Sequence, residues 1–166
     1  MIKSCFPPVA DADTRVLVLG SLPGEASLAR AQYYAHPRNQ FWRLMGAVTG
    51  AAALVDMGYP DRLETLRAAG IGLWDVIGSA SRRGSLDAAI RDHAPNELST
   101  FTATLPSLRA IAFNGGKASE IGRRQLGANR PFALVTLPSS SPAYTLPLAG
   151  KVEAWLHLRR FLAPSG

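Results

Sequence analysis

Four short apolar segments, separated by stretches of helical character, constrain the fold of this chain more than any other feature of its sequence. They span residues 14–19, 71–77, 109–113 and 132–137, and each runs directly into glycine, asparagine or proline. Apolar runs that stop at such residues are typical of buried strands leading into loops. Because strands alternate with helices, we expect a three-layer α/β/α sandwich with a central, mostly parallel four-stranded sheet.

The segments between these strands carry the spacing and the end signals of helices. In residues 39–48, Phe41, Leu44 and Met45 recur at helical spacing before Gly50. We also expect helices over 60–69, 96–105 with Asn96 as its N-cap, 117–126 and 150–162. The polar and basic stretch 78–95 is expected to be loop with a short helix at 85–91. Ligands of parallel sheets bind outside the carboxyl ends of the strands, so a functional site is expected there.

Length and charge indicate one nucleic-acid-binding domain. A chain of 166 residues fits a single domain, whose core we place at about residues 14–163. The net charge is +6, and 15 of the 18 cationic side chains are arginine. The planar guanidinium suits phosphate oxygens, so this composition favours a nucleic-acid or nucleotide partner. A genome of high G+C content would produce the same excess of arginine.

Several common chemistries lack their motifs. The lone cysteine, Cys5, excludes an internal disulfide and any multi-cysteine metal site within this chain. The three histidines are far apart in sequence, no Gly-x-Ser-x-Gly elbow occurs, and Gly116-Lys117 lacks the upstream glycine of a P-loop. We therefore expect no metal, no hydrolase triad and no nucleotide hydrolysis. No run approaches the roughly 20 apolar residues of a membrane span, which predicts a soluble, cytoplasmic protein.

Two polar clusters lie near the ends of expected strands. Residues 33–42 contain four aromatic side chains together with a histidine, Arg38 and Asn39. Aromatic rings stack on bases, and an arginine can contact phosphate. Residues 138–142 place three serines between two prolines. Each cluster also has a plainer interpretation, because Phe41 and Trp42 suit a helix core and a Ser/Pro loop needs no ligand.

The order of the motifs resembles that of a known family. Residues 20–24 have the pattern Gly-x-x-Pro-Gly, residues 36–42 have His-Pro-x-Asn-x-Phe-Trp, and residues 138–141 have Pro-Ser-x-Ser. In this order they resemble the uracil-DNA glycosylase superfamily, and the likeness extends over residues 16–162. The hypoxanthine-DNA glycosylase branch is the most similar, through residues 20–28 and 33–39.

The resemblance implies roles for individual residues. Mismatch-type relatives hold the attacking water with an asparagine where this chain has Leu22, so the resemblance transfers that catalytic task to Asn39. An alignment on Gly70 puts Asp75 where other relatives read the base edge, and its carboxylate can accept from hypoxanthine N1–H or from uracil N3–H. The base is further expected to contact Gly20, Ser21 and Tyr34, and the DNA backbone to contact Arg38, Ser139, Ser140 and Ser141.

The function that follows is base excision without a cofactor. The resemblance implies a monofunctional DNA glycosylase that flips a deaminated base, hypoxanthine before uracil, and hydrolyses its N-glycosidic bond. We expect a monomer acting on DNA in the cytoplasm, at the bacterial nucleoid. Two other interpretations stay open, namely a DNA-binding module of the same fold that has lost the chemistry, and an α/β enzyme acting on free nucleosides.

Overall fold

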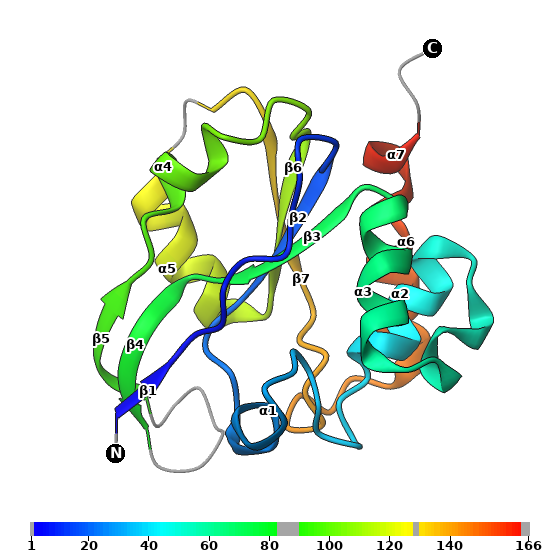
Figure 1. Cartoon of the computed structure of the whole chain (residues 1–166), viewed down its shortest axis with the longest axis horizontal. Helices are drawn as coiled ribbons and strands as arrows, with labels where there is room; N and C mark the ends of the chain where they lie inside the picture. The colour runs from blue at the N-terminus through cyan, green and yellow to red at the C-terminus, as the bar shows by residue number, and fades with distance from the viewer. Residues whose placement is uncertain (1, 83–89, 128–129, 164–166) are drawn as a thin grey trace.

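The computed structural model describes residues 2–82, 90–127 and 130–163. Its centre is a sheet of β3 (Ile71–Asp75), β2 (Val16–Gly20), β6 (Ala110–Asn114) and β7 (Ala133–Leu137), hydrogen-bonded in that order. In the register of this sheet, Leu19 lies between Trp74 of β3 and Phe113 of β6. The expected four-stranded sheet is confirmed, and its strands are all parallel (Figure 1).

Alternate residues of β2 pack into two separate halves of the core. Val16 and Val18 belong to the cluster formed with α2 (Phe41–Thr49), α3 (Tyr59–Ala68), α6 (Leu148–Leu156) and α7 (Arg159–Leu162). Leu17 and Leu19 pack instead with α4 (Leu98–Thr102) and α5 (Gly116–Leu126). Both faces of the sheet are therefore covered by helices, as Figure 1 shows, and the three-layer α/β/α fold is confirmed.

A second, antiparallel sheet corrects the prediction for residues 78–95. In it β4 (Ile77–Arg82) lies between β1 (Ile2–Ser4) and β5 (Ile90–Pro95). The predicted loop is therefore wrong over 78–82 and 90–95, because backbone pairing between polar segments forms strands that hydrophobic periodicity does not indicate. The short helix predicted at 85–91 lies largely outside the described residues, and residues 90–91 belong to β5.

The helices agree with the sequence where an apolar face and an end signal coincide. α2, α3 and α5 are each confirmed within two residues of the predicted ends. α2 stops at Gly50, whose φ of 77° is a left-handed value that glycine adopts at little cost. The predicted helix 150–162 is interrupted after Leu156, which separates α6 from α7. Two short helices, α1 (Glu25–Arg30) and the 3-10 helix η1 (Ala52–Asp56), were not indicated by the sequence pattern.

The segment that precedes β2 packs along β3. Val9 and Leu73 exchange two backbone hydrogen bonds of 2.9 and 2.8 Å. The carbonyl of Phe6 accepts from Trp74 Nε1 at 3.2 Å, and the carbonyl of Pro7 accepts from the Tyr33 hydroxyl at 2.9 Å. Residues 5–10 therefore extend the core beyond the range 14–163 expected from the sequence.

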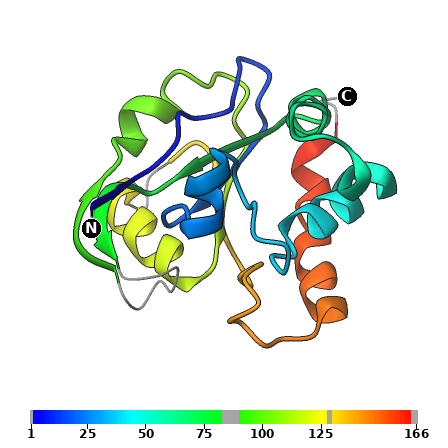
Figure 2. The same ribbon diagram turned by 60° about the horizontal axis from the view of Figure 1, so that its bottom comes forward.

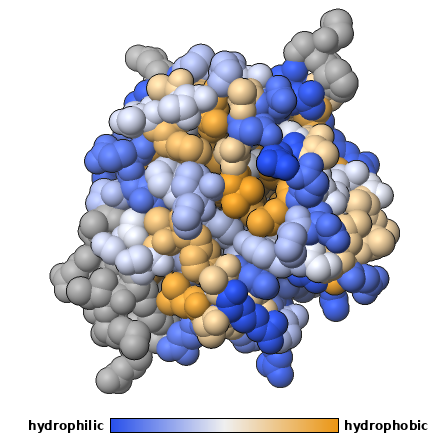
Figure 3. Space-filling view, viewed as in Figure 1, coloured by the Kyte–Doolittle hydropathy of each residue, from blue (hydrophilic) through white to orange (hydrophobic). Residues whose placement is uncertain are grey.

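The carboxyl ends of the parallel strands face α1 and the loop after β7. Figure 2 brings these ends forward, with α1 and the orange segment after β7 in the foreground. Most of the face in Figure 3 is hydrophilic, with apolar surface confined to small patches. Among the described residues, no helix has the length and apolar character that crossing a membrane would require.

Candidate active site

A cavity of about 260 Å³ lies at the carboxyl ends of the parallel strands. It is bounded by the loop after β2, the segment before α2, the last residues of β3 and β6, and the loop after β7. The lining residues include Gly20, Ser21, Tyr34, Asn39, Asp75, Ser139, Ser140 and Ser141. The structure thus brings together, from five segments, every residue singled out by the sequence except Arg38.

The end of β2 is held against the end of β3. The carbonyls of Gly20 and Ser21 accept from the backbone N–H groups of Val76 and Ile77 at 2.8 and 3.1 Å. A Cβ on Gly20 would lie 2.8 Å from Asp75 Oδ1 and 2.9 Å from the Tyr34 hydroxyl oxygen, closer than real contacts allow. A side chain at position 20 would therefore displace both polar groups.

Asp75 places a buried carboxylate in the pocket wall. Only 4% of its surface is exposed. Its backbone carbonyl accepts from Asn96 Nδ2 at 2.7 Å, so Asn96 fixes the end of β3 and is not the N-cap of α4, as the sequence predicted. Burial, reinforced by the negative charge of Asp75, raises the pKa of Tyr33 well above its usual value. Tyr33 therefore remains a neutral hydrogen-bond donor.

Tyr34 presents one ring face to the pocket. Its other face stacks on Phe41, with ring centroids 3.8 Å apart and an interplanar angle of 15°. The backbone of Tyr34 has a φ of 55°, a left-handed conformation that residues other than glycine rarely adopt. Phe41 is fully buried in the core, so the ring of Tyr34 rests on a rigid support.

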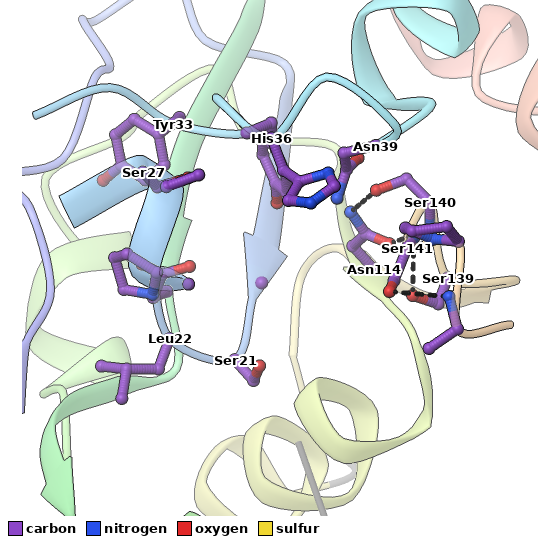
Figure 4. Close-up of a pocket in the computed structure, with 18 residues that line it drawn as sticks. Ser21, Leu22, Ser27, Tyr33, His36, Asn39, Asn114, Ser139, Ser140 and Ser141 are labelled. Carbon is purple, nitrogen blue, oxygen red and sulfur yellow. Dashed lines mark hydrogen bonds between the residues drawn. The ribbon is translucent and has the colours of Figure 1, made fainter. Parts of the chain in front are cut away.

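Asn39 joins the pocket to the start of α2. Its Oδ1 accepts from the backbone N–H of Phe41 at 3.0 Å, which leaves the second lone pair and the amide group for a ligand. The predicted helix start at Asn39 is therefore two residues too early, because α2 begins at Phe41 and the Asn39 side chain accepts from the first N–H of the helix instead of joining it. Figure 4 shows Asn39 beside His36, a lining residue to which the sequence analysis assigned no role.

His36 and Arg38 lie on the turn before Asn39. His36 Nδ1 accepts from the backbone N–H of Arg38 at 3.1 Å, which places the proton of the neutral imidazole on Nε2. His36 is the first residue of the His-Pro-x-Asn-x-Phe-Trp motif at residues 36–42, and this position in the sequence could have assigned it to the site. Arg38 is exposed and does not line the pocket, so only a ligand extending beyond the pocket would reach its guanidinium.

The loop of residues 138–144 after β7, here called the serine loop, is held in place by hydrogen bonds with Asn114. Asn114 Nδ2 donates to Ser140 Oγ and its Oδ1 accepts from the Ser140 backbone N–H, both at 2.9 Å (Figure 4). Ser140 is 0% exposed, and its carbonyl accepts from the Gln40 backbone at 2.9 Å. Its side chain therefore anchors the loop, whereas Ser139 and Ser141 are half-buried at the pocket. The sequence placed Asn114 at a strand end but did not indicate this pairing.

The fold and the pocket together define a class of protein. A parallel sheet whose strand ends surround a pocket with an aromatic face, an amide, a carboxylate and hydroxyls is typical of α/β proteins that bind nucleotide-like ligands. Within the described ranges, no three histidine, cysteine or acidic side chains gather as a metal site would need.

Comparisons with known proteins identify the family. Residues 7–159 match the family model of the uracil DNA glycosylase superfamily, and the chain belongs to that superfamily. It is 46% identical over 143 residues to the hypoxanthine DNA glycosylase of Methanosarcina acetivorans, covering 86% of this chain and 89% of that one. It is 45% identical over 120 residues to the hypoxanthine DNA glycosylase of Methanosarcina barkeri, covering 72% and 75% of the two chains.

A solved structure is similar over almost the full length. It is a solution NMR structure of a Methanosarcina acetivorans protein assigned to the uracil DNA glycosylases. The two structures superpose with a TM-score of 0.84 at 42% sequence identity, over 98% of this chain and 99% of that one.

Proposed function

We propose that this chain is a monofunctional DNA glycosylase that excises hypoxanthine, with uracil as a second substrate, and leaves an abasic site. The observation that carries the proposal is the joint placement of Asn39, Tyr34 and Asp75 in one pocket at the strand ends. The activity named for the two Methanosarcina relatives supports hypoxanthine as the favoured base.

Three groups would recognise the base. A base inside a duplex is out of reach, so it must be flipped into the pocket. There the ring of Tyr34 would stack on it, and the carboxylate of Asp75 would accept the N1–H of hypoxanthine. The same carboxylate accepts the N3–H of uracil, which is why uracil is a second substrate. The backbone at Gly20 and Ser21 would lie beside the base, on which negative charge develops as it leaves.

Cleavage needs a placed water at the sugar. As the glycosidic bond breaks, positive charge develops on the sugar and negative charge on the leaving base. Asn39 would orient the water toward C1′ with the part of its amide that does not cap α2. Leu22, which lines the pocket with an apolar side chain, can neither hold nor polarise a water. In this proposal the reaction uses no cofactor, because hydrolysis by water needs no electron carrier, and no amine nucleophile takes part.

The DNA backbone would bind around the mouth of the pocket. Arg38, exposed beside the pocket, and the hydroxyls of Ser139 and Ser141 are suited to phosphate oxygens. Ser140 would serve the same contact indirectly, by holding the loop. We propose that the protein acts as a monomer. Because the proposed substrate is DNA, we expect the enzyme to act in the cytoplasm, at the nucleoid.

A side-by-side excision assay tests the proposal. Matched duplexes carrying hypoxanthine, uracil or xanthine are incubated with excess enzyme, and abasic sites are revealed by alkaline strand cleavage. We expect release of hypoxanthine fastest and no strand cleavage before alkali. Duplex binding without release from any substrate would indicate a non-catalytic DNA-binding module, and release from free deoxyinosine but not from duplex would indicate a nucleoside enzyme. Either result overturns the proposal.

A further inference from the structure

Lys151 is a buried lysine beneath the serine loop. It lies in α6 and only 1% of its surface is exposed. Its Nζ donates to the carbonyl of Ser141 at 3.1 Å and lies 5.5 Å from the ring centroid of Tyr144. The loop that follows β7 thus covers a cation.

Holding this loop in place does not require a charge. One helical turn beyond Lys151, Trp155 Nε1 donates to the carbonyl of Pro138 at 2.9 Å. A neutral indole therefore fixes one end of the loop, and the neutral amide of Asn114 fixes its middle. The carbonyl of Ser141 accepts from Lys151 although the neutral backbone N–H of Tyr144 also donates to it, at 3.1 Å.

The buried charge has no carboxylate to offset it. Among the residues that the structure describes, no acidic side chain lies within ion-pair distance of Lys151 Nζ. Burial accordingly lowers the pKa of Lys151. A buried cation without a carboxylate partner is costly to the free protein even where a carbonyl and an aromatic ring contact it, and apolar replacements of buried charges are often neutral or stabilising. A lysine that lowers the stability of the free protein and lies beside a binding pocket points to an anion that arrives with the ligand.

We propose that Lys151 supplies the buried counter-charge for a DNA phosphate that binds over the loop of residues 139–144. This inference rests on the proposed function. Ser139 and Ser141 are half-buried at the pocket, and their hydroxyls accept from backbone N–H groups of the loop, which leaves each O–H to donate to a phosphate oxygen. Lys151 donates to the carbonyl of the same Ser141. Charges separated by a thin layer of protein are screened less than charges separated by water. Lys151 is thus a positioning residue for the DNA strand and does not touch the reacting atoms.

The experiment compares Lys151→Met, Lys151→Arg and the parent chain. Duplex dissociation constants are measured by fluorescence anisotropy at several salt concentrations, together with thermal unfolding and single-turnover excision. Arg124→Met is the matched control, because it also removes one cation, from an exposed position on α5 whose ion pair is with Glu120. For Lys151→Met we expect an affinity about tenfold lower or more at low salt. The slope of log Kd against log salt should fall by up to about 0.9, the value for one phosphate on a duplex.

The remaining readouts separate charge from structure. We expect Lys151→Met to unfold at the parental temperature or above it, and to excise at the parental rate once enzyme is saturating. Lys151→Arg should retain the salt slope, and Arg124→Met should bind nearly as the parent does. Unchanged affinity of Lys151→Met, an unchanged slope with a lowered unfolding temperature, or failure of this variant to fold would each overturn the inference. A parent chain that binds no duplex would instead overturn the proposed function.

Discussion

At the scale of single residues, Asn39 has a structural contact at the start of α2 and, in our proposal, also orients the attacking water. Because its Oδ1 caps α2, its removal affects both the helix and the proposed water. We expect Asn39→Ala to lower the single-turnover rate at saturating enzyme by about 10²-fold or more, on the scale of one lost transition-state contact. Duplex affinity should stay near the parental value, because the amide contributes to the reaction more than to binding.

Asn39→Ser separates the two tasks. A serine hydroxyl also caps a helix, so its stability should stay close to that of the parent, whereas Asn39→Ala should lose about 0.5–2 kcal/mol. The serine side chain is too short to hold the water, so its rate should fall as far as that of the alanine variant. Thermal unfolding and single-turnover excision on a hypoxanthine duplex measure the two effects. Parental cleavage by either variant would remove Asn39 from the chemistry.

The sequence predicted single residues well where a strand end places them. Gly20 and Asp75 lie opposite one another in the register of β2 and β3, so their meeting follows from two correctly predicted parallel strands. The pairing of Asn114 with Ser140 was beyond such reasoning, because it depends on how far the loop after β7 folds back toward β6. Burial of Lys151 is equally invisible in sequence, where a lysine in a helix normally indicates exposure.

At the scale of elements, the loop after β7 is anchored through Ser140, and we propose that Ser139 and Ser141 of the same loop bind DNA. Ser140→Ala leaves the buried Nδ2 of Asn114 without its acceptor, so we expect a loss of about 1–3 kcal/mol in unfolding free energy. For Ser141→Ala we expect near-parental stability and duplex affinity lower by about 0.5–1.5 kcal/mol, for damaged and undamaged DNA alike. Chemical denaturation and anisotropy on both variants test this contrast. Equal loss of stability in both would show that the loop has no such division.

Elements were predictable where hydrophobic periodicity determines them. The strands of the parallel sheet are buried on both faces by helices, so their apolar runs stand out from the sequence. The small antiparallel sheet depends on backbone pairing between polar segments and gives no such signal. α1 was missed because its six residues are too few to show a helical period.

At the scale of the whole molecule, the N-terminal segment contacts the pocket through Tyr33, a lining residue whose hydroxyl donates to the Pro7 carbonyl. The carbonyls of Phe6 and Pro7 accept hydrogen bonds from Trp74 and Tyr33, and Tyr33 is adjacent to Tyr34, which we propose to stack on the base. Deleting residues 1–10 therefore leaves two largely buried donors without their acceptors, at about 1–3 kcal/mol each, and also removes the pairing of Val9 with Leu73. We expect a lower unfolding temperature, by about 2–4 °C for each kcal/mol lost.

A shorter deletion distinguishes the pocket from the small sheet. Removing residues 1–4 takes away β1, which pairs with β4, but keeps Phe6, Pro7 and Val9. We expect this variant to excise hypoxanthine at nearly the parental saturating rate, because the acceptors of Tyr33 and Trp74 remain in place. The 1–10 deletion should excise hypoxanthine more slowly even at temperatures where circular dichroism shows it folded. The reason is that Tyr33, the neighbour of Tyr34, is displaced when its acceptor is removed. Equal rates for the two deletions would confine the N-terminal segment to a role in stability and remove it from the construction of the pocket.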